Sequence, residues 1–180
     1  MTSPPRLAAR RLWVTALYAI AMAFVEASVV VYLRALYYPD RFVLPSTRRF
    51  LYFYHGEPPG LLPALPPLHL RVEIVREAAT MVMLAAVGWL AGTARRDRLA
   101  YFLFAFGLWD IFYYVFLRIT LGWPQSLGTV DLLFLIPVPW VGPVWMPLLA
   151  SLVFVGGGAW WVVRDSRAAE GERVTLATSD

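Results

Sequence analysis

Four stretches of apolar residues, separated by polar or proline-rich segments, dominate the chain. They cover about 12–33, 72–92, 99–118 and 144–163. Each has close to the roughly 20 residues that a helix needs to cross about 30 Å of hydrocarbon at about 1.5 Å per residue. The pattern therefore predicts an all-α integral membrane bundle of four transmembrane helices, folded as a single domain over 12–167.

Two segments between these stretches are expected to form an outer lid on the bundle. Segment 34–71 contains seven prolines, which exclude one continuous helix. Ser46 is a candidate cap for a short helix through the aromatic cluster 50–54. The second lid segment is 119–143, and its part 131–143 begins with an apolar run too short to cross and contains three prolines. We expect it to be re-entrant or interfacial rather than a fifth crossing.

The distribution of arginines predicts the orientation of the helices. With the N-terminus inside, nine arginines flank the inner ends of the spans and six flank the outer ends. Cytoplasmic segments carry the excess of basic residues in membrane proteins. Residues 1–11 and a polar, disordered tail over 168–180 are therefore expected in the cytoplasm, and the protein in a bacterial inner membrane. The first apolar run continues to Leu33, which favours a retained span over a cleaved signal peptide.

Composition excludes several classes of function. The chain of 180 residues has no cysteine, and all 16 of its basic residues are arginine. Disulfides, thiolate metal sites and catalytic lysines are therefore absent. The net charge of +4 is explained by arginines beside the spans, so nucleic acid is not an expected partner. The expected partners are the lipid bilayer and either another membrane protein or a lipid-like ligand.

Three carboxylates interrupt the apolar stretches, and they are the candidate functional groups. Glu26, Glu77 and Asp110 lie in the first, second and third stretch. A carboxylate near the middle of a spanning helix costs about 2.5–3.5 kcal/mol on insertion scales. Exposing three of them to lipid is therefore improbable, and we expect all three to point into the bundle and to share a site with Arg76.

Helical spacing extends this candidate site to further polar residues. Four polar residues of the second helix are spaced four, four and three positions apart: His69, Glu73, Glu77 and Thr80. They share one face of the helix, provided that the helix begins at or before His69. On the third helix, one face carries Asp110, Tyr113, Tyr114 and Arg118. Asp131 is expected on the same side of the membrane.

Three interpretations of these residues stay open at the level of sequence. In the first, Arg76 and Arg118 neutralise the carboxylates, and the network only fixes helix packing, as in an accessory subunit of a larger complex. In the second, acids and a histidine bind a metal ion, and the protein is a membrane-embedded enzyme acting on a lipid-like substrate. The candidate metal ligands are Glu26, His69, Glu73, Glu77 and Asp110.

In the third interpretation, the acids bind a proton, a cation or a small lipid-like ligand in an outward-facing site. The candidate ligand-binding residues are Arg76, Tyr113, Tyr114 and Asp131, with tryptophans as further aromatic walls. No nucleophile elbow, glycine-rich phosphate loop or haem-attachment motif decides between these interpretations. The sequence leaves open whether the protein is an enzyme and identifies no cofactor.

Overall fold

The computed structural model describes residues 4–37, 52–53 and 66–177, and within them the chain is mostly helical. The helices are α1 (Pro4–Tyr37), α2 (Pro67–Ala91), α3 (Arg95–Leu121) and α4 (Trp145–Ala177). All four are long and apolar enough to cross a membrane. The prediction of four long apolar helices is confirmed, and each begins or ends beyond the predicted limits because polar turns extend it.

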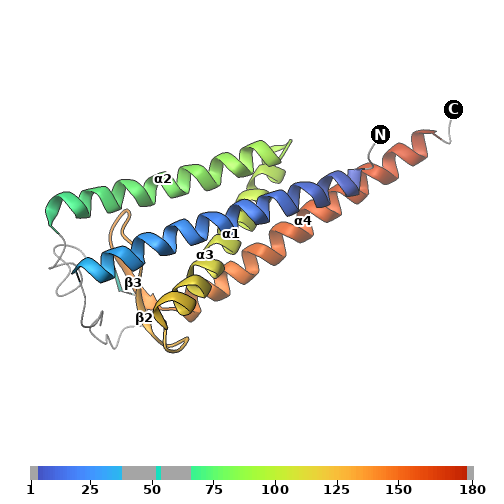
Figure 1. Ribbon diagram of the computed structural model, residues 1–180. Coiled ribbons are helices and arrows are strands. Elements are labelled where there is room, and N and C mark those ends of the chain that lie inside the picture. The colour runs from blue at the N-terminus through green and yellow to red at the C-terminus, as the bar shows by residue number, and fades with distance from the viewer. Residues whose placement is uncertain (1–3, 38–51, 54–65, 178–180) are drawn as a thin grey trace.

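Helix α3 is the centre of the bundle and packs against the other three helices (Figure 1). Small residues allow this close packing. A Cβ atom on Gly107 would lie 2.5 Å from the Ser151 carbonyl of α4, and one on Gly158 would lie 2.5 Å from the Ala100 carbonyl of α3. Small side chains also form the buried face of α1, at Ala19 and Ala23. The two chain ends lie at one end of the bundle.

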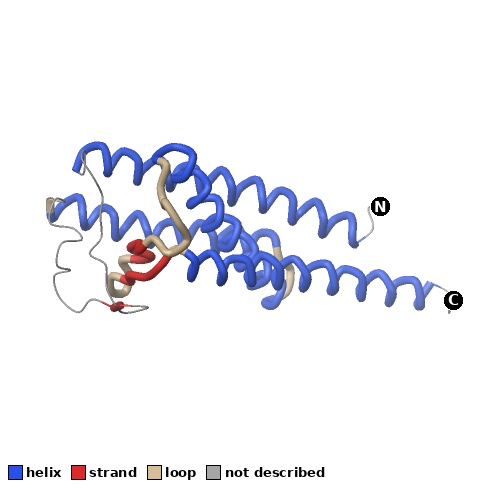
Figure 2. The backbone as a smooth tube through the Cα atoms, turned by 90° about the horizontal axis from the view of Figure 1, so that it is seen from below, coloured by secondary structure: helices blue, strands red, loops and turns tan. Residues whose placement is uncertain are grey.

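A small antiparallel sheet lies at the opposite end of the bundle (Figure 2). Its strands are β1 (Tyr52–Phe53), β2 (Val130–Phe134) and β3 (Trp140–Pro143), in the order β1-β3-β2. Val130 pairs with Pro143, and Leu132 pairs with Val141. The sheet is a difference from the all-α prediction.

Strands β2 and β3 form the hairpin that the sequence predicts only as an irregular lid segment. Residues 131–143 do not continue the straight helix α4, which begins after them at Trp145. Pro137 and Pro139 lie in the turn of the hairpin and Pro143 ends β3, positions where a missing N–H group is tolerated. The prolines therefore shape a hairpin instead of preventing regular structure.

Two further predictions are wrong. The aromatic cluster was expected in a short helix, but Tyr52–Phe53 form β1 and pair with β3, while Ser46 and the rest of that cluster lie outside the described residues. The tail from 168 onward was expected to be disordered, but α4 continues to Ala177. The tail contains no proline, and its alanine, glutamate and arginine residues favour helix.

Candidate functional site

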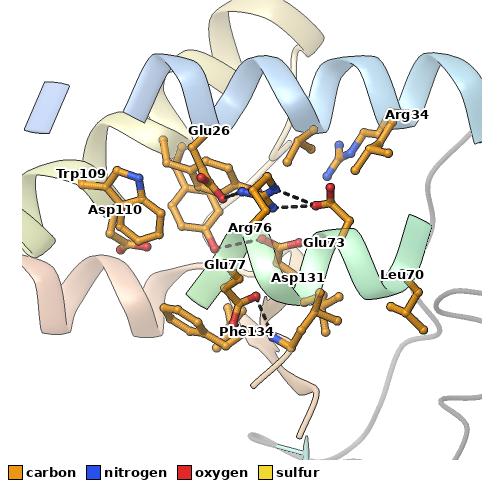
Figure 3. A pocket seen from close by; sticks show the side chains of 17 residues that line it. Glu26, Arg34, Leu70, Glu73, Arg76, Glu77, Trp109, Asp110, Asp131 and Phe134 are labelled. Carbon is orange, nitrogen blue, oxygen red and sulfur yellow. Dashed lines mark hydrogen bonds and ion pairs between the residues drawn. The ribbon is translucent and has the colours of Figure 1, made fainter. Parts of the chain in front are cut away.

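A cavity of about 130 Å³ lies where α1, α2, α3 and the β2–β3 hairpin meet (Figure 3). For scale, an apolar cavity of about 150 Å³ in a protein core holds benzene. Apolar side chains from each element form much of the lining, including Leu33, Leu70, Leu132 and Phe134. The polar groups between them come from four separate segments of the chain.

Arg76 joins helices α1 and α2 at the wall of the cavity. Its Nε and Nη2 atoms donate to Oε2 of Glu73 at 2.9 and 2.7 Å, and its Nη1 atom donates to the Glu26 carboxylate. Thr80 Oγ1 donates to the other oxygen of Glu26 at 3.1 Å. The planar guanidinium with its several donors suits this bridging position, because it reaches two carboxylates at once.

Glu77 connects α2 to the hairpin through hydrogen bonds. Its carboxylate accepts the backbone N–H of Leu135 at 3.0 and 3.1 Å and that of Ile136 at 3.2 Å. These two amides follow β2 directly and begin the turn toward β3. Glu77 thus positions the end of the hairpin over the cavity without using an arginine.

Asp110 has a neutral partner. It is 6% exposed, and Ser151 Oγ of α4 donates to its Oδ2 at 2.8 Å. No described arginine forms an ion pair with it. The close approach of α3 and α4 at Gly107 lies less than one helical turn from Asp110, which places Ser151 within reach.

Asp131 of β2 lies against the aromatic end of α3. The Tyr114 hydroxyl donates to its Oδ2 at 3.0 Å. Burial raises the pKa of the Asp131 carboxyl to about 6, while the nearby Arg34 guanidinium and the Tyr114 hydroxyl act in the opposite direction. Arg34 itself lies over the ring of Trp123, 4.0 Å from its centroid.

The charges around the cavity are unequal. Among the described residues that line it, five are acidic and two are basic: Glu26, Glu73, Glu77, Asp110 and Asp131 against Arg34 and Arg76. With every group ionised, the lining carries a formal charge of −3. Excess charge of one sign away from water is unfavourable unless a counter-charge or a proton neutralises it.

Trp109 contributes an unused donor beside these acids. It is 6% exposed and lines the cavity, and its indole Nε1 has no hydrogen-bond partner among the described residues. Figure 3 shows the ring next to Asp110 at one edge of the site. Buried indole N–H groups normally find an acceptor.

The structure brings most of the predicted site residues together. The cavity lining includes Glu26, Glu73, Arg76, Glu77, Asp110, Tyr113, Tyr114 and Asp131. The predicted stripe on α2 is present, because Glu73, Glu77 and Thr80 are all buried on one face.

Two candidates lie outside the cavity. His69 is exposed, and its Nδ1 atom forms a hydrogen bond with the Tyr37 hydroxyl. Arg118 was expected to neutralise a carboxylate, but its Nη1 atom donates to the carbonyl oxygens of Gly122 at 2.5 Å and Pro124 at 3.0 Å, just beyond the end of α3. It is therefore part of the helix terminus rather than of the site.

The five candidate metal ligands do not form one coordination group. Within the part of the chain that the structure describes, no cluster of three or more histidine, aspartate and glutamate side chains is placed to hold a metal ion. Glu26 and Glu73 instead contact Arg76, and Glu77 contacts backbone amides.

Sequence reasoning missed Arg34, Ser151 and the Leu135–Ile136 amides as parts of the site. The sequence contains a signal for Arg34, because its spacing from Glu26 places both on one face of the first helix. The residues of this face that line the cavity are Glu26, Val30, Leu33 and Arg34. Ser151 lies in an otherwise apolar stretch, but so do many serines that only bond to their own helix. The amides had no signal, because every non-proline residue carries one.

Comparison with known protein families, with characterised proteins and with solved structures yields no significant match. The case for a function therefore rests on the chemistry of this cavity.

Proposed function

We propose that the protein is a multi-pass membrane protein whose cavity binds a small organic cation, an amine with a compact apolar body. The observation that carries this proposal is the excess of acids over arginines in the lining. The two arginines offset part of the charge of Glu26, Glu73 and Asp131. Asp110 is buried with only a serine hydroxyl as its described hydrogen-bond partner, so it is the group that a bound ammonium would pair with.

The size and the walls of the cavity favour an organic cation over a metal ion. About 130 Å³ accommodates a group close to benzene in size. Trp109, Tyr113 and Phe134 supply aromatic surfaces, which attract ammonium groups when water is excluded. A bare divalent cation requires several oxygen ligands around one point, and the described acids do not form such a group.

The free indole donor of Trp109 adds a second requirement. An acceptor atom on the ligand, such as a hydroxyl or ether oxygen, would satisfy Nε1, which has no described protein partner. An amine that also carries such an oxygen would therefore bind more tightly than the amine alone. The competing role for the same acids is to hold a proton, which would neutralise Asp110 without any ligand.

The first prediction tests the cation directly with benzylamine, which carries an ammonium group on a benzene-sized body. At ten times its dissociation constant, a ligand of the folded state adds about 1.4 kcal/mol of stability. For a chain of this length, that corresponds to a rise of roughly 3–5 °C in the midpoint of thermal unfolding. We expect this rise for the protein in mild detergent with benzylamine, and none with the neutral isostere benzyl alcohol.

The control variants separate the cavity from other acidic groups. Asp110→Asn should lose the response to benzylamine, because the amide keeps the shape but removes the charge. Asp165→Asn, an exposed aspartate outside the cavity, should keep it. An equal response to benzylamine and benzyl alcohol would contradict the proposal, and so would an undiminished response in Asp110→Asn. A third outcome is that benzylamine does not stabilise the wild type and that Asp110→Asn is more stable than the wild type at neutral pH. This outcome would indicate that the site holds a proton instead of an organic cation.

A further inference from the structure

A second hollow lies between α1 and α2 at the end of the bundle that carries the chain termini. It has a volume of about 390 Å³, three times that of the carboxylate cavity. Its apolar surface comes from Leu7 and Val14 of α1 and from Val87, Leu90 and Ala91 of α2. Leu90 is 82% exposed and Val14 is 57% exposed, so the groove is open to the surroundings of the bundle.

The length of the groove matches one leaflet of a bilayer. Its lining on α1 runs from Leu7 to Tyr18, which is about 16 Å along the axis at about 1.5 Å per residue. Half of a hydrocarbon core of about 30 Å is about 15 Å. The α1 wall of the groove is therefore comparable in length to one leaflet, while the α2 wall covers residues 87–91.

The lining decides what kind of ligand fits the groove. Its described residues include apolar side chains from both helices and two arginines, but no acidic residue. A phospholipid has a matching apolar chain and an anionic phosphate. We therefore take a lipid, rather than a helix from another protein, as the occupant.

Two arginines lie in the α1 wall of this groove, near the end of the bundle that carries the termini. Arg10 and Arg11 are part of its lining, one turn from Leu7, and neither forms a salt bridge with a described residue. Arginine binds phosphate through two parallel hydrogen bonds, and basic pockets between membrane helices bind anionic headgroups. The groove therefore combines two phosphate-binding side chains with an apolar surface that continues for about 12 Å along α1, from Arg10 to Tyr18.

We propose that this groove is a specific site for an anionic phospholipid, with one acyl chain between α1 and α2 and the headgroup phosphate on Arg10 and Arg11. The site is independent of the carboxylate cavity, which lies at the opposite end of the bundle. It rests on the four helices crossing a bilayer, as their length and composition indicate. The lipid would fill the gap that the side chains of α1 and α2 leave open.

Native mass spectrometry with defined lipids tests this site. The second prediction is that purified protein retains dioleoyl phosphatidylglycerol in preference to dioleoyl phosphatidylcholine, which has the same chains and no net charge. Arg10→Gln with Arg11→Gln should reduce retention of phosphatidylglycerol by roughly thirtyfold, the effect expected for two arginines near an anionic headgroup. Val14→Trp should also reduce retention, because the ring fills the apolar part and leaves both charges in place.

A charge-matched variant provides the control. Arg164→Gln with Arg167→Gln removes two arginines from α4, near the same end of the bundle but outside this groove. It should retain phosphatidylglycerol as the wild type does. Equal retention of the two lipids would overturn the proposal. So would an equal loss in both double variants, or full retention in Val14→Trp. Circular dichroism of each variant confirms that a loss is not due to unfolding.

Discussion

At the scale of single residues, the acids in the cavity have three kinds of hydrogen-bond partner: an arginine, backbone amides and hydroxyl groups. Glu26 contacts an arginine and a threonine, Glu77 contacts backbone amides, and Asp110 contacts a serine. A carboxylate that loses its only charged partner inside a protein is strongly destabilising. A hydroxyl group can donate to a carboxylate or accept from a carboxylic acid, whereas a backbone N–H group can only donate. The described side-chain hydrogen-bond partners of Asp110 and Asp131 are hydroxyl groups, so these two acids are the ones best able to respond to pH or to a ligand.

Asp131 provides the third prediction, a pH dependence of stability. Burial raises the pKa of its carboxyl from 3.8 to about 6, so the folded protein binds this proton more readily than the unfolded chain does. Stability from this group is complete below pH 3.8 and is lost as the pH rises through 6. Between pH 5 and 7.5 the loss is about 1.4 kcal/mol, at about 1.36 kcal/mol per pKa unit.

The measurement compares the free energy of unfolding of the wild type with that of Asp131→Asn at pH 5 and pH 7.5. The wild type should lose about 1.4 kcal/mol relative to the variant over this range. Asp165→Asn, which alters an exposed carboxyl, should follow the wild type. If the wild type instead gained free energy of unfolding relative to Asp131→Asn as the pH rises, the Arg34 guanidinium would outweigh the effect of burial on the pKa of Asp131.

At the scale of the elements, glycines decide how closely the helices approach. Of the three consecutive glycines in α4, only Gly158 faces α3, where an added Cβ would meet the Ala100 carbonyl. A Cβ on Gly156 or Gly157 would meet nothing within 4 Å. The same α3–α4 contact continues to Gly107 and Ser151, so the position of the Asp110 partner depends on it.

The fourth prediction follows from this difference between neighbouring glycines. Gly158→Ala should destabilise the fold by about 1–3 kcal/mol, because the clash is with backbone and α4 has to move away from α3. Gly157→Ala should be neutral or stabilising by up to about 1 kcal/mol, because alanine favours helix and the methyl group is in open space. Unfolding in detergent with increasing denaturant measures both. Equal effects of the two changes would show that the glycines act only through helix propensity.

At the scale of the whole molecule, the site and the termini lie at opposite ends of the bundle (Figure 1). The end with the termini carries the inter-helix turn with Arg95, Arg96 and Arg98, whereas the other end carries the hairpin and the carboxylates. The excess of basic residues predicts that this end faces the cytoplasm, and on that prediction the cavity would open on the outer side. A ligand for the carboxylates would then enter from outside the cell.

The fifth prediction concerns this orientation. A reporter that is active only in the periplasm should be inactive when it is fused after Asp180. The same reporter inserted between residues 57 and 58 should be active, because that segment lies between α1 and α2, on the side predicted to face outward. Activity of the C-terminal fusion would place the termini outside and the cavity on the cytoplasmic side.

The number and type of the main elements were predictable because they depend on local pattern. A run of about 20 apolar residues has few alternatives to a membrane helix, since backbone groups in lipid require internal hydrogen bonds. The stripe of Glu73, Glu77 and Thr80 was predictable for a similar reason, because helical periodicity alone places them on one face. The insertion cost of Glu26 and Asp110 likewise indicated that they point inward.

The sequence by itself thus determined the four apolar helices and which of their acids point into the bundle. The tertiary structure decided which group each acid contacts. The Glu26–Arg76 contact joins residues 50 apart in the chain, and the contact of Glu77 with Leu135 joins residues 58 apart. No local pattern encodes such distant pairs. A local pattern also does not show that backbone N–H groups will donate to a carboxylate, or that prolines will lie in the turn of a hairpin. These features depend on how the helices pack, and only the folded chain brings them to one cavity.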